Sequence, residues 1–303
     1  MLETLQECPV CLHRDFVPFL SCRDFTVTQE EFNLVNCTHC GFTFTNPRPD
    51  EGSIAKYYQS ESYISHSNTR KGLINQIYHF IRQRALKNKL KLIDNLQKDQ
   101  KIQDQSSKKL LDYGCGTGDF LHTCLLGGWQ IEGLEPDPKA RAQAAQITQT
   151  EIREHIFEPY FNGKQLDIIT LWHVLEHVHR LDETLERLRS MVKPGGNLVI
   201  AVPNLKGWEA GFFKEFWAAY DVPRHLYHFS PVTMKKLLAK HRMKILRKLP
   251  MPYDAYYVSL LSNQYQFGRM KYMKSFLEGY YSNRQAAKSG NYSSLIYTVE
   301  LLK

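Results

Sequence analysis

A short glycine-rich stretch in the middle of the chain has the residue types of a ligand-binding turn. Two leucines lead into Asp112, and glycines then stand at every second position, at Gly114, Gly116 and Gly118. Only glycine adopts positive φ readily and lets a ligand lie close to the backbone. Apolar residues at helical spacing follow over 117–126. The stretch therefore predicts a strand, a tight turn and a helix whose first N–H groups face a ligand.

The acids around this turn indicate which kind of ligand it binds. A dinucleotide fingerprint has the pattern G-x-G-x-x-G, whereas here the third glycine comes one residue earlier and Asp119 follows it. An acid two residues before the first glycine would repel a pyrophosphate, but it suits a ligand that carries an ammonium and a sulfonium. The next predicted strand, over 129–135, ends at Glu135, whose carboxylate suits two ribose hydroxyls. The alternative is a glycine-rich turn that binds no ligand.

These residues resemble the class I S-adenosylmethionine (SAM)-dependent methyltransferases, in which an acid precedes G-x-G-x-G and the second strand also ends in an acid. A later run, from HVLEH at 173–177 through PGG to VPN at 202–204, matches the same family. The resemblance implies that Asp112 meets the methionine end of SAM and that Glu135 holds its ribose hydroxyls. The full set that it implies for the cofactor site is Asp112, Gly114, Cys115, Gly116, Thr117, Gly118, Glu135, Pro136, Asp137, Ile156, Phe157, Leu171, Trp172 and His173.

Four histidines are candidates for the general base that methyl transfer often requires. Transfer from a sulfonium is an in-line displacement, and an imidazole with a pKa near 6.5 suits removal of the acceptor's proton. His173 directly follows the fourth predicted strand and is the first candidate, and His225, beside Arg224, is the second. His177 and His228 lie in similar segments. Each of them has the alternative of only bonding the backbone or positioning a helix, and an acceptor with an acidic hydroxyl needs no base.

Two C-x-x-C pairs near the N-terminus have the composition of a metal site. The first is formed by Cys8 and Cys11, and the second by Cys37 and Cys40. Four thiolates fit a closed tetrahedral zinc site, which supplies folding energy to a segment too small for a core of its own. We therefore expect a structural zinc ribbon, and the alternative is a ribbon that folds without metal. A redox role is disfavoured because no βαβ pattern surrounds either pair.

The segment after the second pair extends the resemblance. An aromatic strand, N-P-R-P at 46–49 and paired tyrosines at 57–58 are similar to a bacterial subgroup of these methyltransferases with N-terminal zinc ribbons. Members of that subgroup often act in surface-polysaccharide or other small-molecule biosynthesis. The resemblance covers nearly the whole chain.

The predicted elements alternate between strand and helix, as in a doubly wound α/β domain. We expect a seven-stranded, Rossmann-like class I methyltransferase sheet with an antiparallel final strand, preceded by the zinc ribbon and a helical linker. The expected organisation is a ribbon over 1–49, a basic helical connecting segment over 50–105 and a methyltransferase domain over 106–303. Two aromatic connections, at about 203–229 and 250–291, are candidate lids over the substrate.

The net charge of +8 comes from one part of the chain. Eleven Lys or Arg and three Asp lie between Arg70 and Lys109, so the rest is close to neutral. A solvated helix face explains this excess, and the alternative is a docking face for an anionic substrate, a membrane surface or RNA. No window approaches 18 uninterrupted apolar residues and the first residues lack a secretory pattern, so we expect a cytoplasmic protein without a transmembrane helix.

Two functions compete on this basis. The leading hypothesis is SAM-dependent methyl transfer to oxygen or carbon of a small-molecule acceptor, such as a sugar, a lipid-linked or a quinone-like compound, because an aromatic lid suits a discrete acceptor. The alternative is an RNA or protein methyltransferase that docks its substrate on the basic helix and the ribbon, although no nucleic-acid motif beyond charge is present. A binding module without activity is disfavoured by the intact cofactor motif. The sequence leaves the oligomeric state open.

Overall fold

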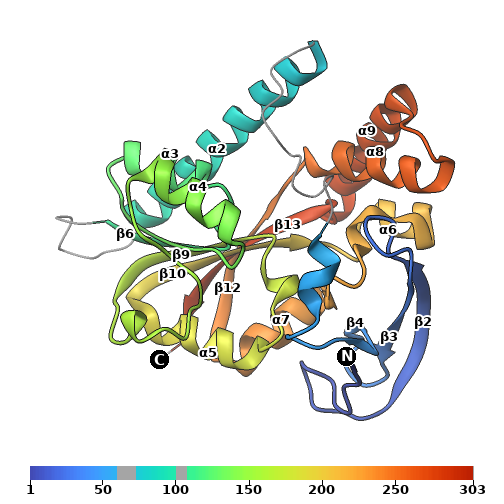
Figure 1. Ribbon diagram of the computed structural model, residues 1–303, viewed down its shortest axis with the longest axis horizontal. Helices are drawn as coiled ribbons and strands as arrows, with labels where there is room; N and C mark the ends of the chain where they lie inside the picture. Colours follow the sequence, from blue (N-terminus) through green and yellow to red (C-terminus); the bar gives the residue numbers. More distant parts are fainter. Residues whose placement is uncertain (60–72, 100–107, 303) are drawn as a thin grey trace.

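A seven-stranded sheet forms the centre of the molecule in the computed structural model, which describes residues 1–59, 73–99 and 108–302 (Figure 1). Its strand order is β12-β13-β10-β9-β6-β7-β8, and only β13 runs antiparallel to its neighbours. The strands are β6 (Lys109–Tyr113), β7 (Gln130–Leu134), β8 (Ile152–Arg153), β9 (Leu166–Trp172), β10 (Val192–Pro203), β12 (Met243–Pro250) and β13 (Ser294–Leu301). The sequence-based prediction of a seven-stranded sheet with an antiparallel last strand is therefore confirmed.

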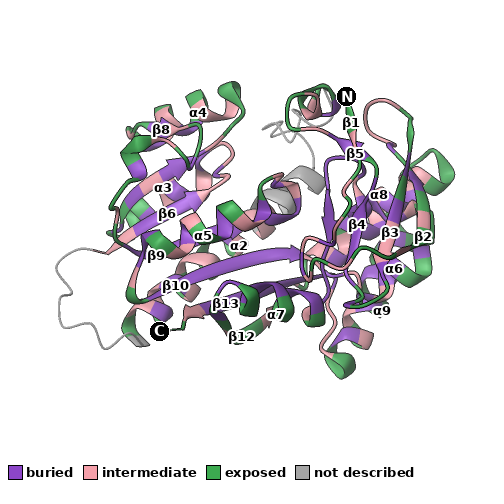
Figure 2. Ribbon diagram, turned by 90° about the horizontal axis from the view of Figure 1, so that it is seen from below, coloured by how far each residue is buried: buried purple, intermediate pink, exposed green. Residues whose placement is uncertain are grey.

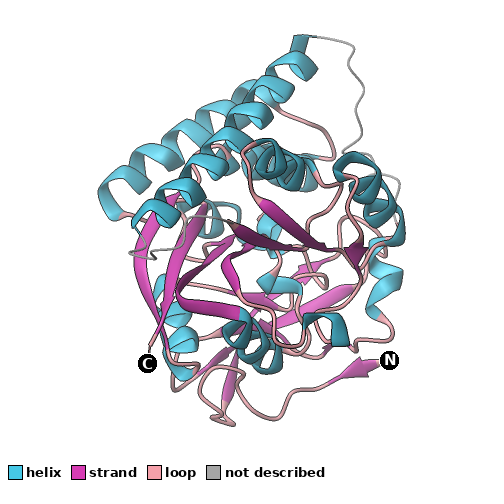
Figure 3. Cartoon of the chain, turned by 90° about the vertical axis from the view of Figure 1, so that its left-hand side faces the viewer, coloured by secondary structure: helices cyan, strands magenta, loops and turns pink. Residues whose placement is uncertain are grey.

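Helices cover both faces of this sheet (Figure 3). One face carries α2 (Leu73–Asp99), α3 (Asp119–Leu126) and α4 (Pro138–Thr148), whose apolar side chains share a core with β6 and β9. The other face carries α5 (Leu181–Met191) and α7 (Pro231–Lys240), which share a second core with the same strands. Six of the seven residues of β9 are buried, as expected for a parallel strand covered on both sides.

The N-terminal residues form a separate small sheet, which we call the ribbon sheet. It contains β2 (Phe16–Arg23), β3 (Glu31–Cys37) and β4 (Thr43–Thr45), while β1 (Leu2–Glu3) pairs with β5 (Arg48–Pro49). Its fourth strand, β11 (Tyr227–His228), comes from the middle of the chain and pairs with β4. A short 3₁₀ helix, η1 (Ile54–Tyr58), follows the ribbon sheet.

The first predicted lid, over 203–229, packs against the ribbon sheet. It contains α6 (Trp208–Phe213), η4 (Lys214–Phe216), η5 (Ala218–Tyr220) and β11. Most of its aromatic side chains are buried, including Trp217 at 2 % exposure (Figure 2). Side chains of the ribbon sheet and of η1 line the same core as this connection.

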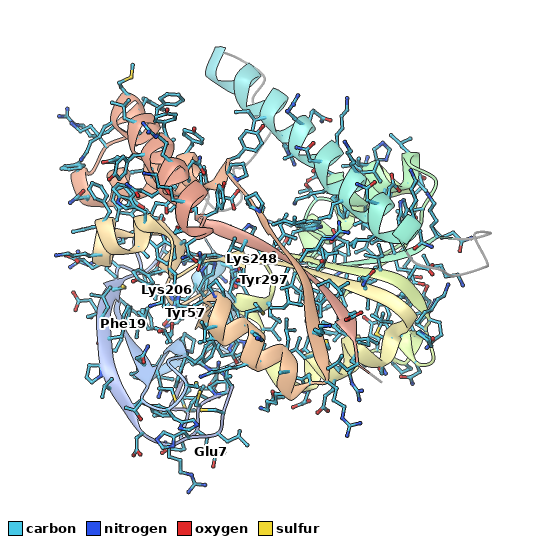
Figure 4. All side chains as sticks on the ribbon, turned by 180° about the vertical axis from the view of Figure 1, so that it is seen from behind. Glu7, Phe19, Tyr57, Lys206, Lys248 and Tyr297 are labelled. Carbon is cyan, nitrogen blue, oxygen red and sulfur yellow. The ribbon has the colours of Figure 1, made fainter. Side chains whose placement is uncertain are left out.

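A buried ion cluster fixes this contact, and we call it the Arg224 cluster. The Arg224 guanidinium donates to Asp24 of the ribbon segment at 3.1 Å and to Asp221 at 2.6 Å. It also donates to the backbone carbonyl of Tyr57, at 2.8 Å. The arginine is 1 % exposed and Asp24 is fully buried. Tyr57, labelled in Figure 4, lies where the ribbon sheet meets the rest of the molecule.

The second predicted lid, over 250–291, forms a pair of packed helices at one corner of the molecule (Figure 1). These are α8 (Asp254–Phe267) and α9 (Tyr272–Ser289), and Gly279 lets α9 approach Tyr256 of α8 closely. Their outer faces expose aromatic and apolar side chains, Phe276 and Leu277 among them. None of the described helices is long and apolar enough to cross a membrane.

Candidate functional site

The glycine turn lies at the carboxyl end of β6, where the strand order reverses between β7 and β9. In open α/β sheets, ligands bind in the crevice at such a point. The backbone N–H groups of Gly114 and Cys115 both donate to the Leu134 carbonyl, at 2.7 and 2.9 Å, which fixes the turn to β7. The three glycines have φ values of 72°, 55° and 84°, a region that other residues adopt with strain. The strand, turn and helix predicted from the sequence are all present.

The glycines differ in what surrounds them. A Cβ at Gly118 would lie 2.8 Å from the Ala144 Cα of α4, and a Cβ at Gly114 would meet Val174. A Cβ at Gly116 would meet no described atom within 4 Å. Gly116 is therefore the position of the turn that faces open space, where a ligand can approach the backbone.

Glu135 lies directly beside this opening. Its Oε2 accepts a hydrogen bond from the Gly116 N–H at 2.8 Å, and its Oε1 accepts one from the Asp137 N–H at 3.0 Å. Burial raises the pKa of Glu135, and the two amide hydrogen bonds act against that rise. The Arg141 guanidinium donates to the carbonyls of Glu135 and Pro136, both at 2.7 Å, and so fixes the loop after β7. The structure thus places Glu135, the residue predicted to bind the ribose hydroxyls, beside the glycine turn.

The other predicted cofactor residues surround the same edge. Asp137 caps α4 by accepting a hydrogen bond from the Ala140 N–H at 2.7 Å. Ile156 is buried, whereas Phe157 is 44 % exposed. Leu171 and Trp172 end β9, next to β6 in the sheet.

Asp112 is buried at the end of β6. It is 2 % exposed and accepts a hydrogen bond from the Thr170 hydroxyl at 2.5 Å. Burial raises the pKa of Asp112 to about 7, although the Thr170 hydrogen bond and the charge of Lys89 act against that rise. The Lys89 ammonium lies 4.2 Å from the centre of the Trp172 ring, and burial lowers the pKa of Lys89. Sequence analysis missed Lys89, because it is one of many cations on α2.

His173, the first candidate base, is held between two carboxylates. Its Nδ1 lies 3.4 Å from Glu176 Oε1, and its Nε2 lies 3.2 Å from Asp254 Oδ2 at the start of α8. Burial alone would lower the pKa of His173, but the two carboxylates outweigh burial and raise the pKa to about 10. In this arrangement His173 is a cation at neutral pH, so a role as base requires that these carboxylates move away or lose their charge.

His225, the second candidate, lies against His177 with ring centres 4.6 Å apart. His225 Nδ1 is 2.9 Å from the Ala219 carbonyl. His177 Nδ1 is 3.0 Å from both the Arg224 carbonyl and the Tyr58 hydroxyl, and burial lowers the pKa of His177 to about 4. In the sequence Tyr58 is recognisable only as part of the paired-tyrosine motif, and nothing there indicates its contact with His177.

The four predicted zinc ligands come together at the tip of the ribbon sheet. The Sγ atoms of Cys8 and Cys40 are 3.5 Å apart, those of Cys11 and Cys37 are 3.6 Å apart, and all four lie within 4.8 Å of one another. A tetrahedral zinc with Zn–S bonds of about 2.3 Å requires S–S separations of roughly 3.8 Å. The thiol positions therefore fit a four-cysteine zinc site.

A family model described as a methyltransferase domain matches residues 77–246, more than half of the chain. The chain belongs to this methyltransferase family. The matched region contains the glycine turn, Glu135 and the histidines at the sheet edge, and it leaves out the N-terminal strands β1 to β5.

Similar proteins agree with this family. The methyltransferase-family chain is 30 % identical over 110 residues to a ubiquinone biosynthesis O-methyltransferase of Salmonella arizonae, covering 33 % of this chain and 44 % of that protein. It is 31 % identical over 118 residues to a tRNA U34 carboxymethyltransferase of Idiomarina loihiensis, covering 36 % of each. The chain thus matches less than half the length of these curated relatives.

A solved structure of magnesium protoporphyrin IX methyltransferase from Synechocystis, with bound SAH, shares the fold. The TM-score is 0.53 at 14 % sequence identity, and the match covers 84 % of this chain and all of that one. At this identity the likeness concerns the fold alone.

Proposed function

We propose that this protein transfers a methyl group from SAM to oxygen or carbon of a small-molecule acceptor. The observation that carries the proposal is the position of Glu135, whose carboxylate lies against the Gly116 N–H at the edge of the open space beside that glycine. Such a carboxylate suits the two hydroxyls of a ribose, and the open glycine suits close packing of the nucleoside. Membership of the methyltransferase family supports the same reading.

In this proposal the chain's residues hold SAM by its charges and its hydroxyls. Glu135 accepts hydrogen bonds from the ribose hydroxyls, and Asp112 faces the ammonium directly or through a water. The residues from Gly114 to Gly118 pack under the methionyl and ribose parts. Pro136 and Asp137 lie beside the adenine, and Ile156 or Phe157 flanks it. Trp172 and His173 end the strand nearest to the sulfonium. SAM supplies the electrophilic methyl group, and these residues position it.

A surface cavity supports a discrete acceptor. It has a volume of about 410 Å³, and half of its lining residues are tyrosines. The lining consists of Tyr253, Tyr256, Tyr280 and Tyr292 together with Pro252, Asn283, Arg284 and Ala287. Tyr253 immediately precedes Asp254, whose carboxylate contacts His173. One residue of the cavity wall is thus the sequence neighbour of a residue that contacts the sheet edge, and on this basis we place the acceptor in the cavity. Aromatic walls suit a flat or apolar acceptor, as in a quinone-like or lipid-linked compound.

The ribbon sheet holds structural zinc in this proposal. The four thiolates would bind the metal, and zinc binding would supply folding energy to a sheet whose own core is small. We assign residues 1–49, which supply β1 to β5, to an N-terminal zinc ribbon that the segment over 50–105 links to the methyltransferase domain over 106–303.

An RNA acceptor is the second candidate. The exposed cations Arg84, Lys87 and Lys91 lie on α2, and one relative is a tRNA U34 carboxymethyltransferase. Cations on a helix surface also occur without any nucleic acid, so the aromatic cavity favours the small molecule. Incubation with tritiated SAM and either total RNA or a small-molecule extract separates the two candidates by the fraction that becomes labelled.

The cofactor site is tested with Glu135→Gln. The substitution keeps the size of the side chain and removes the charge that strengthens its hydrogen bonds to ribose. We expect the Kd for SAH, measured by calorimetry, to rise about 10- to 100-fold. Glu132→Gln is the matched control, since Glu132 lies on the same strand but pairs with Lys164 at 2.9 Å. Equal SAH affinity in Glu135→Gln and in the wild type would contradict the placement of the ribose.

A further inference from the structure

Glu176 is a fully buried carboxylate with few hydrogen-bond donors or cations around it. It is 0 % exposed, and neither of its oxygens accepts a hydrogen bond from the part of the chain that the structure describes. The nearest cation is His173, whose Nδ1 lies 3.4 Å from Oε1. Burying a carboxylate is costly unless hydrogen bonds, an opposite charge or a metal compensate it. Glu176 therefore requires a partner beyond a single long contact.

Two imidazoles face this carboxylate. One ligand atom each from Glu176, His177 and His225 lies within 4.8 Å of the others. They come from two places in the sequence, the turn η3 (Leu175–His177) after β9 and the connection that carries β11. A carboxylate and two imidazoles are a common ligand set for divalent transition metals.

The hydrogen bonds of both histidines fix which nitrogen is available. His177 Nδ1 lies at 3.0 Å from the Arg224 carbonyl, and His225 Nδ1 lies at 2.9 Å from the Ala219 carbonyl. A carbonyl only accepts hydrogen bonds, so each Nδ1 carries the proton and each neutral ring has its lone pair on Nε2. The Tyr58 hydroxyl, 3.0 Å from His177 Nδ1, then also acts as an acceptor. Metal-binding histidines are held in the same way, with the second ring nitrogen donating to a backbone carbonyl or a carboxylate.

The charges around the site also favour a cation. Asp221, which belongs to the buried Arg224 cluster, lies near the same imidazoles, and its Oδ2 is 3.9 Å from His225 Nε2. The Asp221 carboxylate therefore adds to the negative field in which a divalent cation beside Glu176 would lie.

We infer that Glu176, His177 and His225 form a second metal site, separate from the four cysteines, which binds a divalent transition cation of the zinc class. The three side chains leave at least one coordination position for water or for an oxygen of a bound small molecule. The inference gives His225 a role as ligand in place of that of general base. The proposed metal site depends on these three residues and not on the identity of the acceptor, so it can be tested independently of the proposed reaction.

Metal content of the purified full-length protein tests this site. After dialysis against ZnCl₂ and removal of free metal, mass spectrometry of the metal should give two zinc ions per wild-type chain. Glu176→Gln and His177→Gln should each give one. The matched control is His228→Gln, because His228 is a buried histidine of the same connection whose Nε2 lies 3.2 Å from the Thr45 hydroxyl, outside the three-residue set. It should keep two.

Two further measurements assign the second ion even where a variant folds poorly. With CoCl₂ in place of zinc, thiolate-to-cobalt absorption reports the cysteine site, and it should be unchanged in Glu176→Gln. Crystals of the wild type should show an anomalous peak at the zinc edge among the three side chains. One zinc per wild-type chain, with an anomalous peak at the cysteines alone, would overturn the inference. SAH binding is measured separately, so loss of the second metal and failure of the proposed function remain distinguishable.

Discussion

Binding of the cofactor should expel a proton from Asp112. Burial raises the pKa of this carboxyl to about 7, so a large share of it is neutral in the free protein below pH 7. The proposed ligand brings an ammonium to the same place, and a nearby positive charge favours the ionised carboxylate. Because the ligand selects the ionised form, its affinity should rise as the pH rises through about 7.

The size of the effect follows from the protonated fraction. With a pKa of about 7, Asp112 is roughly 0.9 protonated at pH 6 and about half protonated at pH 7. We therefore expect the release of about 0.9 proton per SAH bound at pH 6 and about 0.5 at pH 7. The ionised fraction grows about fivefold between these values, so SAH should bind about fivefold more tightly at pH 7 than at pH 6. Higher pH is avoided because the ligand's own amino group titrates near pH 8.

Calorimetry in buffers of different ionisation enthalpy measures this release directly, as the slope of the observed binding enthalpy against that ionisation enthalpy. Asp112→Asn should remove the slope at pH 6. Thr170→Val should keep the slope at pH 6 and increase it at pH 7, because the Thr170 hydrogen bond lowers the pKa of Asp112 and its loss leaves more of the carboxyl protonated. A slope near zero for the wild type at pH 6 would refute the reasoning, since Asp112 would then be ionised before binding or would lie outside the field of the ligand.

Three further predictions concern the turn, the ion cluster and the ribbon sheet. Gly118→Ala should lower the free energy of unfolding by about 1–3 kcal/mol in urea titrations, because φ is +84° and the new Cβ would meet Ala144. Gly116→Ala should cost about 1 kcal/mol and mainly weaken SAH binding, and unchanged binding would argue against this turn as the cofactor site. Asp24→Asn should cost about 3–5 kcal/mol because it removes a carboxylate from the buried Arg224, whereas Glu151→Gln, at an exposed ion pair, should change stability by less than about 0.5 kcal/mol. Chelation of zinc should lower Tm and expose residues 1–49 to proteolysis, and a chelator-insensitive Tm in a protein shown to contain zinc at the cysteines would contradict a structural role.

The parts of the fold that sequence analysis predicted depend on local signals. The glycine turn and the fourth predicted strand, β9, are each determined by residues that are close together in the sequence. Glu135 could be placed because parallel neighbours end at the same edge of a sheet. The four cysteines could be grouped because thiols in two C-x-x-C pairs have few other uses in one small segment.

The parts that it missed depend on contacts between distant residues. Lys89 lies on α2 near Asp112 and Trp172, but the sequence pattern of this helix does not distinguish Lys89 from the exposed cations around it. Asp254 reaches His173 across 81 positions of sequence and changes the imidazole from a candidate base into a paired cation. Hydrophobic periodicity does not predict such pairs, because it describes each helix or strand separately and not the contacts between two of them.

The connection over 203–229 joins the ribbon sheet to the candidate site at the edge of the central sheet. It adds β11 to the ribbon sheet, places the Arg224 guanidinium on Asp24, and presents His225 to Glu176 at the edge of the central sheet. A movement of this segment as a free lid would break all three contacts, and the Arg224 cluster is buried. The ribbon sheet therefore acts through this connection as a fixed support for the histidines. Any opening that admits an acceptor is then expected on the side of α8 and α9, where the helices expose aromatic side chains and where the cavity lies.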